Sequence, residues 1–518
     1  MKSFKSTAFI SIFLVFIAVM SVTNIPLVMD PIKRLAAKET DFTGFVSEVK
    51  ENYLSDFNQK NMYVNINGLF AKMTGRKVYN EVAILENGML INEALNERDL
   101  SSSTEKLAEF SNYIKQTGRE YLYVEAPYKM DLENTLRPIG VENHANEIAN
   151  DVLEKLDKLN VDTLDLRPLV SKTPEMVEQN FYVTDHHWNV NGSFIGFTEI
   201  TKKICEYFPN IEVPYYYLDK ANWNSTVYED FFLGSLGKRV GKYFAGVDDV
   251  TYLTPKFDTE ISTYIVNHKT FKKGDFVDAN MNLKYFEDEP KYFEDNTYCM
   301  YLGGDYPLVM HRNSKAPIDL KILLLKDSFS IPVQAYLSTV FSEIDVIDPR
   351  YYNTTTIAEY VEACNPNIVI TMMNPSVSTS ENYYSMGSDT IDKIVEATDA
   401  VTDVDATDKQ IIANDNDYAY TTVATVAPNS KYTFSLEDII VEKGDSEAVT
   451  VALYDTENKT IVTSCALDIE YCKAKKSFEY SFVTSYEKEM ELLVYAGLHG
   501  KTKGNTVTLK GANLVRYK

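Results

Sequence analysis

The sequence predicts an α/β protein in which a three-layer domain around a parallel sheet is followed by a β-sandwich. From about residue 101 to 400, helical stretches alternate with short strands that are apolar on both faces, as buried strands of parallel sheets are. Beyond about residue 405, short alternating strands are separated by Asn, Gly, Asp and Lys turns, which is typical of a β-sandwich. A length of 518 residues allows two to four such domains.

Composition narrows the classes of function. Hydrophobic residues make up 45% and charged residues 24%, as in globular proteins. The 51 Lys and Arg against 75 Asp and Glu give a net charge of -24, which repels nucleic-acid phosphates and argues against a nucleic-acid partner. The five cysteines are too sparse for a disulfide framework or a zinc site. Only Cys465 and Cys472 are close enough to pair, and a bridge and two buried thiols both stay open.

Residues 1–30 carry an export signal. Lys2 and Lys5 precede an uncharged apolar run over 8–22, which fits a signal peptide. No A-x-A cleavage site follows and apolar character continues to Val28, so we favour an uncleaved or slowly cleaved signal anchor. The rest of the chain is then expected outside the cytoplasm, anchored by its N-terminus or secreted.

Three regions follow the signal. Residues 31–100 form an accessory lead-in with helix-favouring stretches and a hairpin, VAILENGMLIN, whose turn is Asn87-Gly88. The α/β domain is assigned to residues 101–404 and the sandwich to 405–518. The α/β domain contains these predicted elements: a Ser/Thr-capped helix 101–118 ending at Gly118, helices 146–160 and 356–364, a helix after Trp188, and strands 121–127, 161–166, 321–327 and 367–373. Residues 388–410 start as a helix and pass into an acidic linker.

The segment FYVTDHHWNVNGS contains the first candidate site. In an extended loop, residues two apart point the same way, so Asp185 and His187 can face one cleft while His186 points away. That pair would supply the acid and base of a catalytic triad. A satisfied structural histidine stays open as the alternative, and a metal site would need further ligands.

The segment LLLKDSFSIP contains the second candidate. A buried strand ends at Lys326 and places Ser328 where α/β folds hold reactive groups, at the carboxyl end of a parallel strand. The following helix can direct backbone N–H groups at a developing oxyanion. The alternative is that Ser328 or Ser330 only caps that helix.

Together, TDHHW and a later strand ending in DSF resemble the DHHW protein family. That family is similar to the SGNH-hydrolase-like proteins that O-acetylate alginate and other exported polysaccharides. The resemblance covers roughly residues 60–400 and implies that Asp185, His187 and Ser328 act as a triad. The sequence departs from common SGNH hydrolases because acid and base precede the serine and Lys326 occupies the usual glycine place.

The oxyanion or substrate-binding groups are less defined. Candidates are the backbone N–H groups from Gly234 to Gly237, the Asn374 side chain and Arg350. A surface turn, a cap and a salt bridge are the respective alternatives.

The resemblance implies a serine O-acyltransferase that moves an acetyl group onto a cell-envelope or secreted polysaccharide. It requires no cofactor and no metal, and it implies a membrane-bound O-acyltransferase partner as acyl donor. A carbohydrate esterase of the same fold and a non-catalytic polysaccharide-binding protein remain alternatives.

The predicted sandwich resembles carbohydrate-binding modules. Tyrosines that could stack on sugars alternate in its strands, although such tyrosines also serve as packing. They are Tyr418, Tyr420, Tyr432 and Tyr495.

Overall fold

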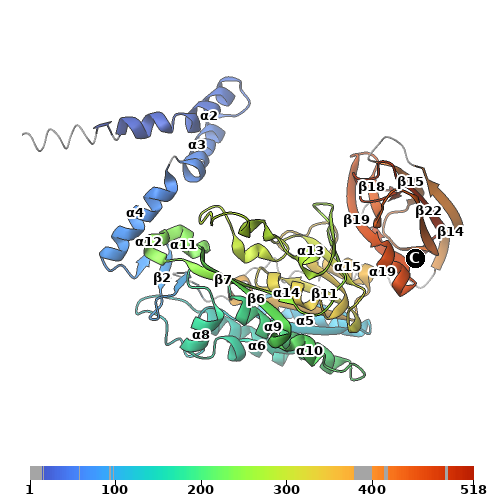
Figure 1. Cartoon of the computed structure of the whole chain (residues 1–518), viewed down its shortest axis with the longest axis horizontal. Coiled ribbons are helices and arrows are strands. Elements are labelled where there is room, and N and C mark those ends of the chain that lie inside the picture. Colours follow the sequence, from blue (N-terminus) through green and yellow to red (C-terminus); the bar gives the residue numbers. More distant parts are fainter. Residues whose placement is uncertain are drawn as a thin grey trace, which may run out of the picture. The chain divides into compact units, whose positions relative to one another are not determined.

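The computed structural model divides the chain into two compact units (Figure 1). The first contains residues 1–80 and 237–246, and the second contains residues 81–236 and 247–518. The residues described are 14–15, 17–57, 59–92, 95–96, 99–378, 400–412, 418–484 and 488–517.

The first unit is helical. It contains α2 (Pro26–Ala36), α3 (Phe42–Asp56), α4 (Lys60–Met73) and α12 (Lys242–Ala245), and α11 (Ser235–Val240) enters it at residue 237. The helices α4 and α12 pack on each other, and a Cβ at Gly68 would lie 2.0 Å from the Val240 carbonyl oxygen, so only glycine allows this approach.

The predicted signal segment falls largely outside the described residues. Residues 14–15 and 17–23 are helical or in a turn, while residues 1–13 and Phe16 are not described. Within the described part of the chain, no helix has the length and apolar character needed to cross a membrane.

The centre of the second unit is an eight-stranded mixed sheet of order β5-β4-β13-β11-β12-β10-β8-β9. The first five strands of that order are parallel, and four of them, β5, β4, β13 and β11, are the predicted ones; the other three strands are antiparallel. The bounds in sheet order are Thr163–Asp165, Glu120–Glu125, Ile368–Met373, Ile318–Lys326, Phe341–Ile347, Leu308–Asn313, Ile261–Ile265 and Thr270–Gly274.

Strands β12 and β10, where the sheet changes from parallel to antiparallel, were missed because they carry charge. β10 and β12 contain Arg312, Glu343 and Asp345, which do not look like buried-strand residues. Arg312 lies 2.8 Å from Asp345 and 3.5 Å from Glu343, so the charges compensate one another across the pair of strands.

Helices cover both faces of this sheet (Figure 1). Leu323 and Leu325 of β11 share one core with α5 (Ser101–Gln116), α6 (Ala145–Lys158) and α15 (Ile357–Cys364). Successive residues of a strand face opposite sides, so Leu324 faces the other layer. That layer holds α9 (Val190–Tyr207) and α14 (Ser330–Leu337), which pack together.

Of two local predictions for this unit, the hairpin is confirmed and the helix cap is wrong. The hairpin is present as β2 (Val82–Ile84) and β3 (Leu90–Asn92), with Gly88 at φ 88° in the turn. The predicted Ser/Thr cap of α5 is wrong. Leu100 holds the N-cap position without a side-chain hydrogen bond, whereas Gly118 does end the helix, at φ 78°.

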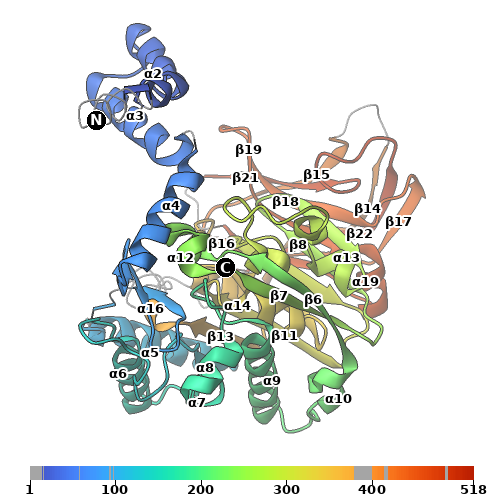
Figure 2. The same ribbon diagram turned by 60° about the vertical axis from the view of Figure 1, so that its left-hand side comes forward.

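The β-sandwich is confirmed (Figure 2). One sheet has the order β14-β22-β16-β20 with β17 on β22, and the other has the order β15-β21-β18-β19. From β14 to β22 the strands are Ala400–Ile411, Tyr420–Val426, Ser430–Leu436, Asp438–Lys443, Ala448–Asp455, Thr460–Asp468, Phe478–Thr484, Met490–Tyr495 and Thr506–Tyr517.

The acidic linker predicted up to residue 410 is wrong where the structure describes it. Residues 400–411 form β14, which pairs with β22, and their acidic side chains lie on an exposed edge strand. The helix predicted from residue 388 lies outside the described residues. Cys465 and Cys472 are buried free thiols.

The four tyrosines named in the sandwich divide into two kinds. Tyr432 and Tyr495 are buried packing residues, whereas Tyr418 and Tyr420 are about half exposed.

Leu324 provides a test of this core. The side chain is fully buried in the central strand β11, so Leu324→Ala should lower the free energy of unfolding by about 2–5 kcal/mol. Leu169→Ala, at a position 40% exposed, should change it by less than about 1 kcal/mol. Chemical denaturation of both proteins measures the difference, and equal losses would contradict this placement of the sheet.

Candidate active site

The structure brings Asp185, His187 and Ser328 into one hydrogen-bonded chain. His187 Nδ1 lies 2.6 Å from Asp185 Oδ1, and His187 Nε2 lies 2.7 Å from Ser328 Oγ. Asp185 and His187 are buried, and Ser328 is half-buried. Ser328 and His187 are 141 residues apart in the sequence, so only the fold produces this contact.

Ser328 is held at the carboxyl end of β11 by Asp327. This buried carboxylate accepts hydrogen bonds from the Phe329 N–H at 2.9 Å and from the Asn374 N–H and side-chain amide at 2.8 and 2.6 Å. Burial raises the pKa of Asp327, and the bonds from Asn374 and Phe329 oppose that shift. α14 has no side-chain cap, so neither Ser328 nor Ser330 has the capping role left open by the sequence.

A pair of opposite charges holds the loop that carries Asp185. The Lys129 ammonium donates to the carbonyls of Tyr182, Val183 and Asp185. On the other side, Asp248 accepts the Val183 N–H at 2.6 Å and the Thr184 N–H at 2.8 Å. Burial lowers the pKa of Lys129 to about 8, against the pull of Asp248 and Asp185. The backbone carbonyls of the loop therefore bind Lys129, and its backbone N–H groups bind Asp248.

Asp185 remains ionised in its buried position. Burial alone would raise its pKa, but the neighbouring imidazoles of His186 and His187, the His187 hydrogen bond and the Ser235 N–H at 2.6 Å hold the pKa well below the usual value. A Cβ at Gly234 would lie 2.3 Å from Asp185 Cβ, so glycine is needed for the chain to pass this close.

Tyr298 and Trp188 hold the His187 ring and the backbone carbonyls of Ser328 and Phe329. The Tyr298 ring stacks on the His187 ring with centroids 3.8 Å apart, and its hydroxyl donates to the Ser328 carbonyl at 2.9 Å. Trp188 Nε1 donates to the Phe329 carbonyl at 2.9 Å. Sequence reasoning missed Tyr298, because it comes from a one-turn 3-10 helix, Thr297–Met300, with no motif around it.

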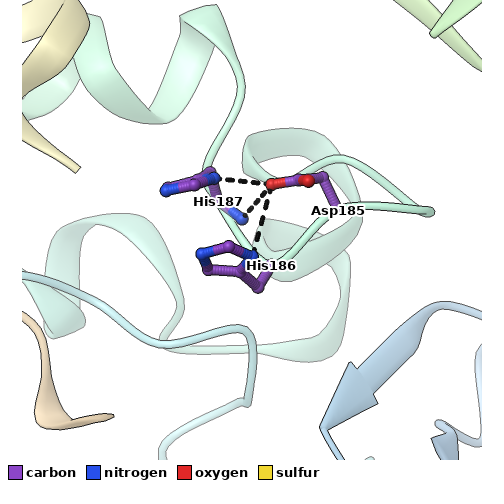
Figure 3. A group of neighbouring side chains, drawn as sticks. All are labelled: Asp185, His186 and His187. Atoms are coloured by element: carbon purple, nitrogen blue, oxygen red, sulfur yellow. Dashed lines mark hydrogen bonds and ion pairs between the residues drawn. The ribbon is translucent and has the colours of Figure 1, made fainter. Parts of the chain in front are cut away.

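Figure 3 shows Asp185, His186 and His187 converging, with one ligand atom of each within 4.8 Å of the others. One carboxylate and two imidazoles could begin a divalent-metal site. However, both His187 nitrogens have protein partners, and His186 Nδ1 lies 2.9 Å from Ser235 Oγ. The geometry therefore favours a hydrogen-bonded chain over a metal centre.

Three of the four further site candidates have other hydrogen-bond or ion-pair partners. The Gly234 N–H donates to Thr184 Oγ1 at 2.7 Å, and Gly237 belongs to the first unit. The Asn374 amide holds Asp327, as described above. Arg350 pairs with Asp348 at 2.6 Å, in line with the salt-bridge alternative.

Lys326, which occupies the usual glycine place, belongs to the same charge network as Arg350. It is 1% exposed, pairs with Asp305 and lies 3.4 Å from Asp348, and Arg350 lies 3.2 Å from Asp305. Two cations and two carboxylates thus neutralise each other beside the end of β11.

A Ser-His-Asp chain at the carboxyl ends of parallel strands is the arrangement found in serine hydrolases and acyltransferases. Residues 86–214 match the family model described as an SGNH hydrolase-like domain, acetyltransferase AlgX. The predicted resemblance to SGNH-hydrolase-like acetyltransferases is therefore confirmed over these residues, which include Asp185 and His187. A comparison with curated proteins gives no match.

Several solved structures are similar to this chain. Bacillus cereus PatB1 is 21% identical, with a TM-score of 0.48, covering 57% of this chain and 96% of PatB1. A DHHW family protein from Eubacterium siraeum is 18% identical, with a TM-score of 0.45, covering 60% and 95%. Pseudomonas aeruginosa AlgX is 12% identical, with a TM-score of 0.32, covering 84% and 94%.

Glu125 gives a pH test of the sheet behind the site. It is fully buried at the end of β4, its Oε1 has no hydrogen-bond partner among the described residues, and burial raises its pKa to about 8. The unfolded state releases the Glu125 proton near pH 4.5 and the folded state keeps it up to about pH 8, so stability is lost as pH rises between these two values.

Glu125→Gln should remove that loss. Its free energy of unfolding relative to the unmodified protein should rise by roughly 3 kcal/mol from pH 5 to pH 8, measured by chemical denaturation. Glu120→Gln, at the other end of the same strand, is the control and should show a much smaller change. A parallel pH dependence of all three proteins would contradict the buried, protonated Glu125.

Proposed function

We propose that this protein is an extracytoplasmic serine O-acyltransferase that moves an acetyl group onto a cell-envelope or secreted polysaccharide. The observation that carries the proposal is the continuous hydrogen-bonded chain from Asp185 through His187 to Ser328. The match of residues 86–214 to an acetyltransferase domain supports acetyl as the transferred group. The polysaccharide acceptor, the location and a membrane-bound O-acyltransferase as donor come from the family resemblance and the apolar N-terminus.

The first half of the reaction forms an acyl-enzyme. His187 Nε2 takes the proton of Ser328 Oγ while that oxygen attacks the carbonyl carbon of the acyl donor. His187 then gives the proton to the leaving group, whose bond to the acyl carbon breaks. Asp185 accepts the Nδ1–H of His187, which keeps Nε2 free as the base and stabilises the imidazolium.

The second half transfers the acyl group. A sugar hydroxyl gives its proton to His187 and attacks the ester carbon, and Ser328 Oγ leaves with that proton. The sugar oxygen gains the acyl group and the enzyme returns to its starting state. The same groups with water as acceptor would make an esterase, so the acceptor decides the outcome.

The two adjacent histidines give a matched test. Turnover of an activated acetyl ester by the purified full-length protein should fall roughly 10³-fold or more in Ser328→Ala and His187→Ala. His186→Ala should stay within about tenfold, because burial and the neighbouring His187 lower the pKa of His186 and its ring contacts Ser235 rather than Ser328. Unchanged turnover in His187→Ala would exclude this mechanism.

Addition of glycan acceptors to the same assay separates transferase from esterase. Faster ester consumption with acetylated sugar as product supports the transferase, and release of acetate alone at an unchanged rate supports the esterase.

Tyr298 should act as a positioning residue. Tyr298→Phe keeps the ring on His187 but removes the hydroxyl that holds the Ser328 carbonyl, so kcat should fall about five- to tenfold with KM little changed. Tyr298→Leu, which also removes the stacked ring, should fall further. A change confined to KM in both variants would assign Tyr298 to substrate binding instead.

A further inference from the structure

The first unit leaves large apolar side chains exposed on its helices. On α4 these are Met62, Ile66, Leu69, Phe70 and Met73, which we call the α4 stripe. Spacings of three and four residues put the stripe on one helix face. Phe70 is 62% and Met73 74% exposed.

The orientation of α4 is the reverse of a normal surface helix. The fully buried residues of α4 are the small Gly68 and Ala71, next to half-buried Val64 and Asn65. On this side Asn65 Oδ1 accepts the Lys242 N–H at 2.8 Å, and the Lys72 ammonium donates to the Phe244 carbonyl at 3.2 Å. A helix that packs through glycine and alanine while exposing phenylalanine and methionine presents its apolar face to a partner.

The neighbouring helices repeat this pattern. Spacings of three, four and seven residues again place the exposed apolar residues on one face. These residues are Ile25, Met29 and Ile32 beside and on α2, and Phe42, Val46 and Tyr53 on α3.

Charge identifies the kind of partner. The first unit holds 13 Lys and Arg against 6 Asp and Glu, while the rest of the chain holds 38 against 69. Lys33 and Lys50 flank the apolar faces of α2 and α3, each about 80° around its helix from the first residue of the face. Lysine stems beside an apolar face can extend along it and place their ammonium groups among lipid headgroups.

We propose that this unit binds the surface of an anionic phospholipid bilayer through the α4 stripe. With 14 residues, α4 is about 21 Å long, too short to cross a hydrocarbon core of about 30 Å but long enough to lie in its interface. The apolar side chains enter the acyl region, and the flanking lysines pair with lipid phosphates. The net positive charge of the first unit thus attracts anionic lipid, although the net charge of the whole protein, -24, repels it.

Tryptophan quenching tests the contact itself, separately from any anchoring by the N-terminal apolar run. Full-length Phe70→Trp is mixed with vesicles of phosphatidylcholine and phosphatidylglycerol whose acyl chains are brominated. Trp188 and Trp223 are 0% and 3% exposed, so the added fluorescence comes from position 70. We expect its emission to fall at least about twofold, and that of the exposed control Ile139→Trp to stay unchanged.

Binding measurements complete the test. Ile66→Ser/Phe70→Ser/Met73→Ser should weaken vesicle binding at least about tenfold, whereas the control Ile139→Ser/Tyr215→Ser/Val227→Ser should not. Lys33→Gln/Lys50→Gln should remove most of the increase in binding caused by phosphatidylglycerol. Circular dichroism checks that the helices persist.

If vesicle-bound Phe70→Trp is not quenched, or if the triple serine variant binds as well as its control, the proposal is wrong and the stripe is a surface for a protein. Neither result depends on acyl transfer, because no residue of the Asp185–His187–Ser328 chain is changed.

Discussion

The buried ionised carboxylate of Asp185 is the constraint on which the site depends. An isolated carboxylate in a protein interior is strongly unfavourable, so every oxygen must be satisfied. Here Oδ1 accepts from His187 and Oδ2 from the Ser235 N–H, and the close passage of Gly234 makes the second contact possible. The requirement fixes the tautomer of His187 and leaves its Nε2 directed at Ser328.

That arrangement in turn depends on how the sheet ends. Asp327 and Ser328 follow the carboxyl end of β11, and Asp327 accepts hydrogen bonds from Asn374, which follows the adjacent strand β13. Lys129, which follows β4, holds the carbonyls of the loop that carries Asp185. The ends of three neighbouring parallel strands, β4, β13 and β11, therefore position both halves of the site, although Ser328 and His187 are 141 residues apart.

Sequence patterns predicted what depends on local periodicity or on adjacent residues. The apolar runs of β4, β11 and β13 identified the parallel strands, and the two-residue spacing placed Asp185 with His187. Patterns could not predict β10 and β12, since Arg312 and Asp345 look exposed until the fold pairs them. They also missed Tyr298, which reaches His187 from a short 3-10 helix, and the side chains of Lys129 and Asp248, which reach the backbone of the loop 182–185 only through tertiary structure.

If Ser328 carries the acyl group, brief exposure to an activated acetyl ester followed by acid quenching should leave one acetyl group on the peptide containing Ser328, as detected by mass spectrometry. This acetyl group should form much more slowly in His187→Ala and be absent from that peptide in Ser328→Ala. An unmodified Ser328 peptide in a protein that turns the ester over, or equal labelling with and without His187, would contradict this role of Ser328.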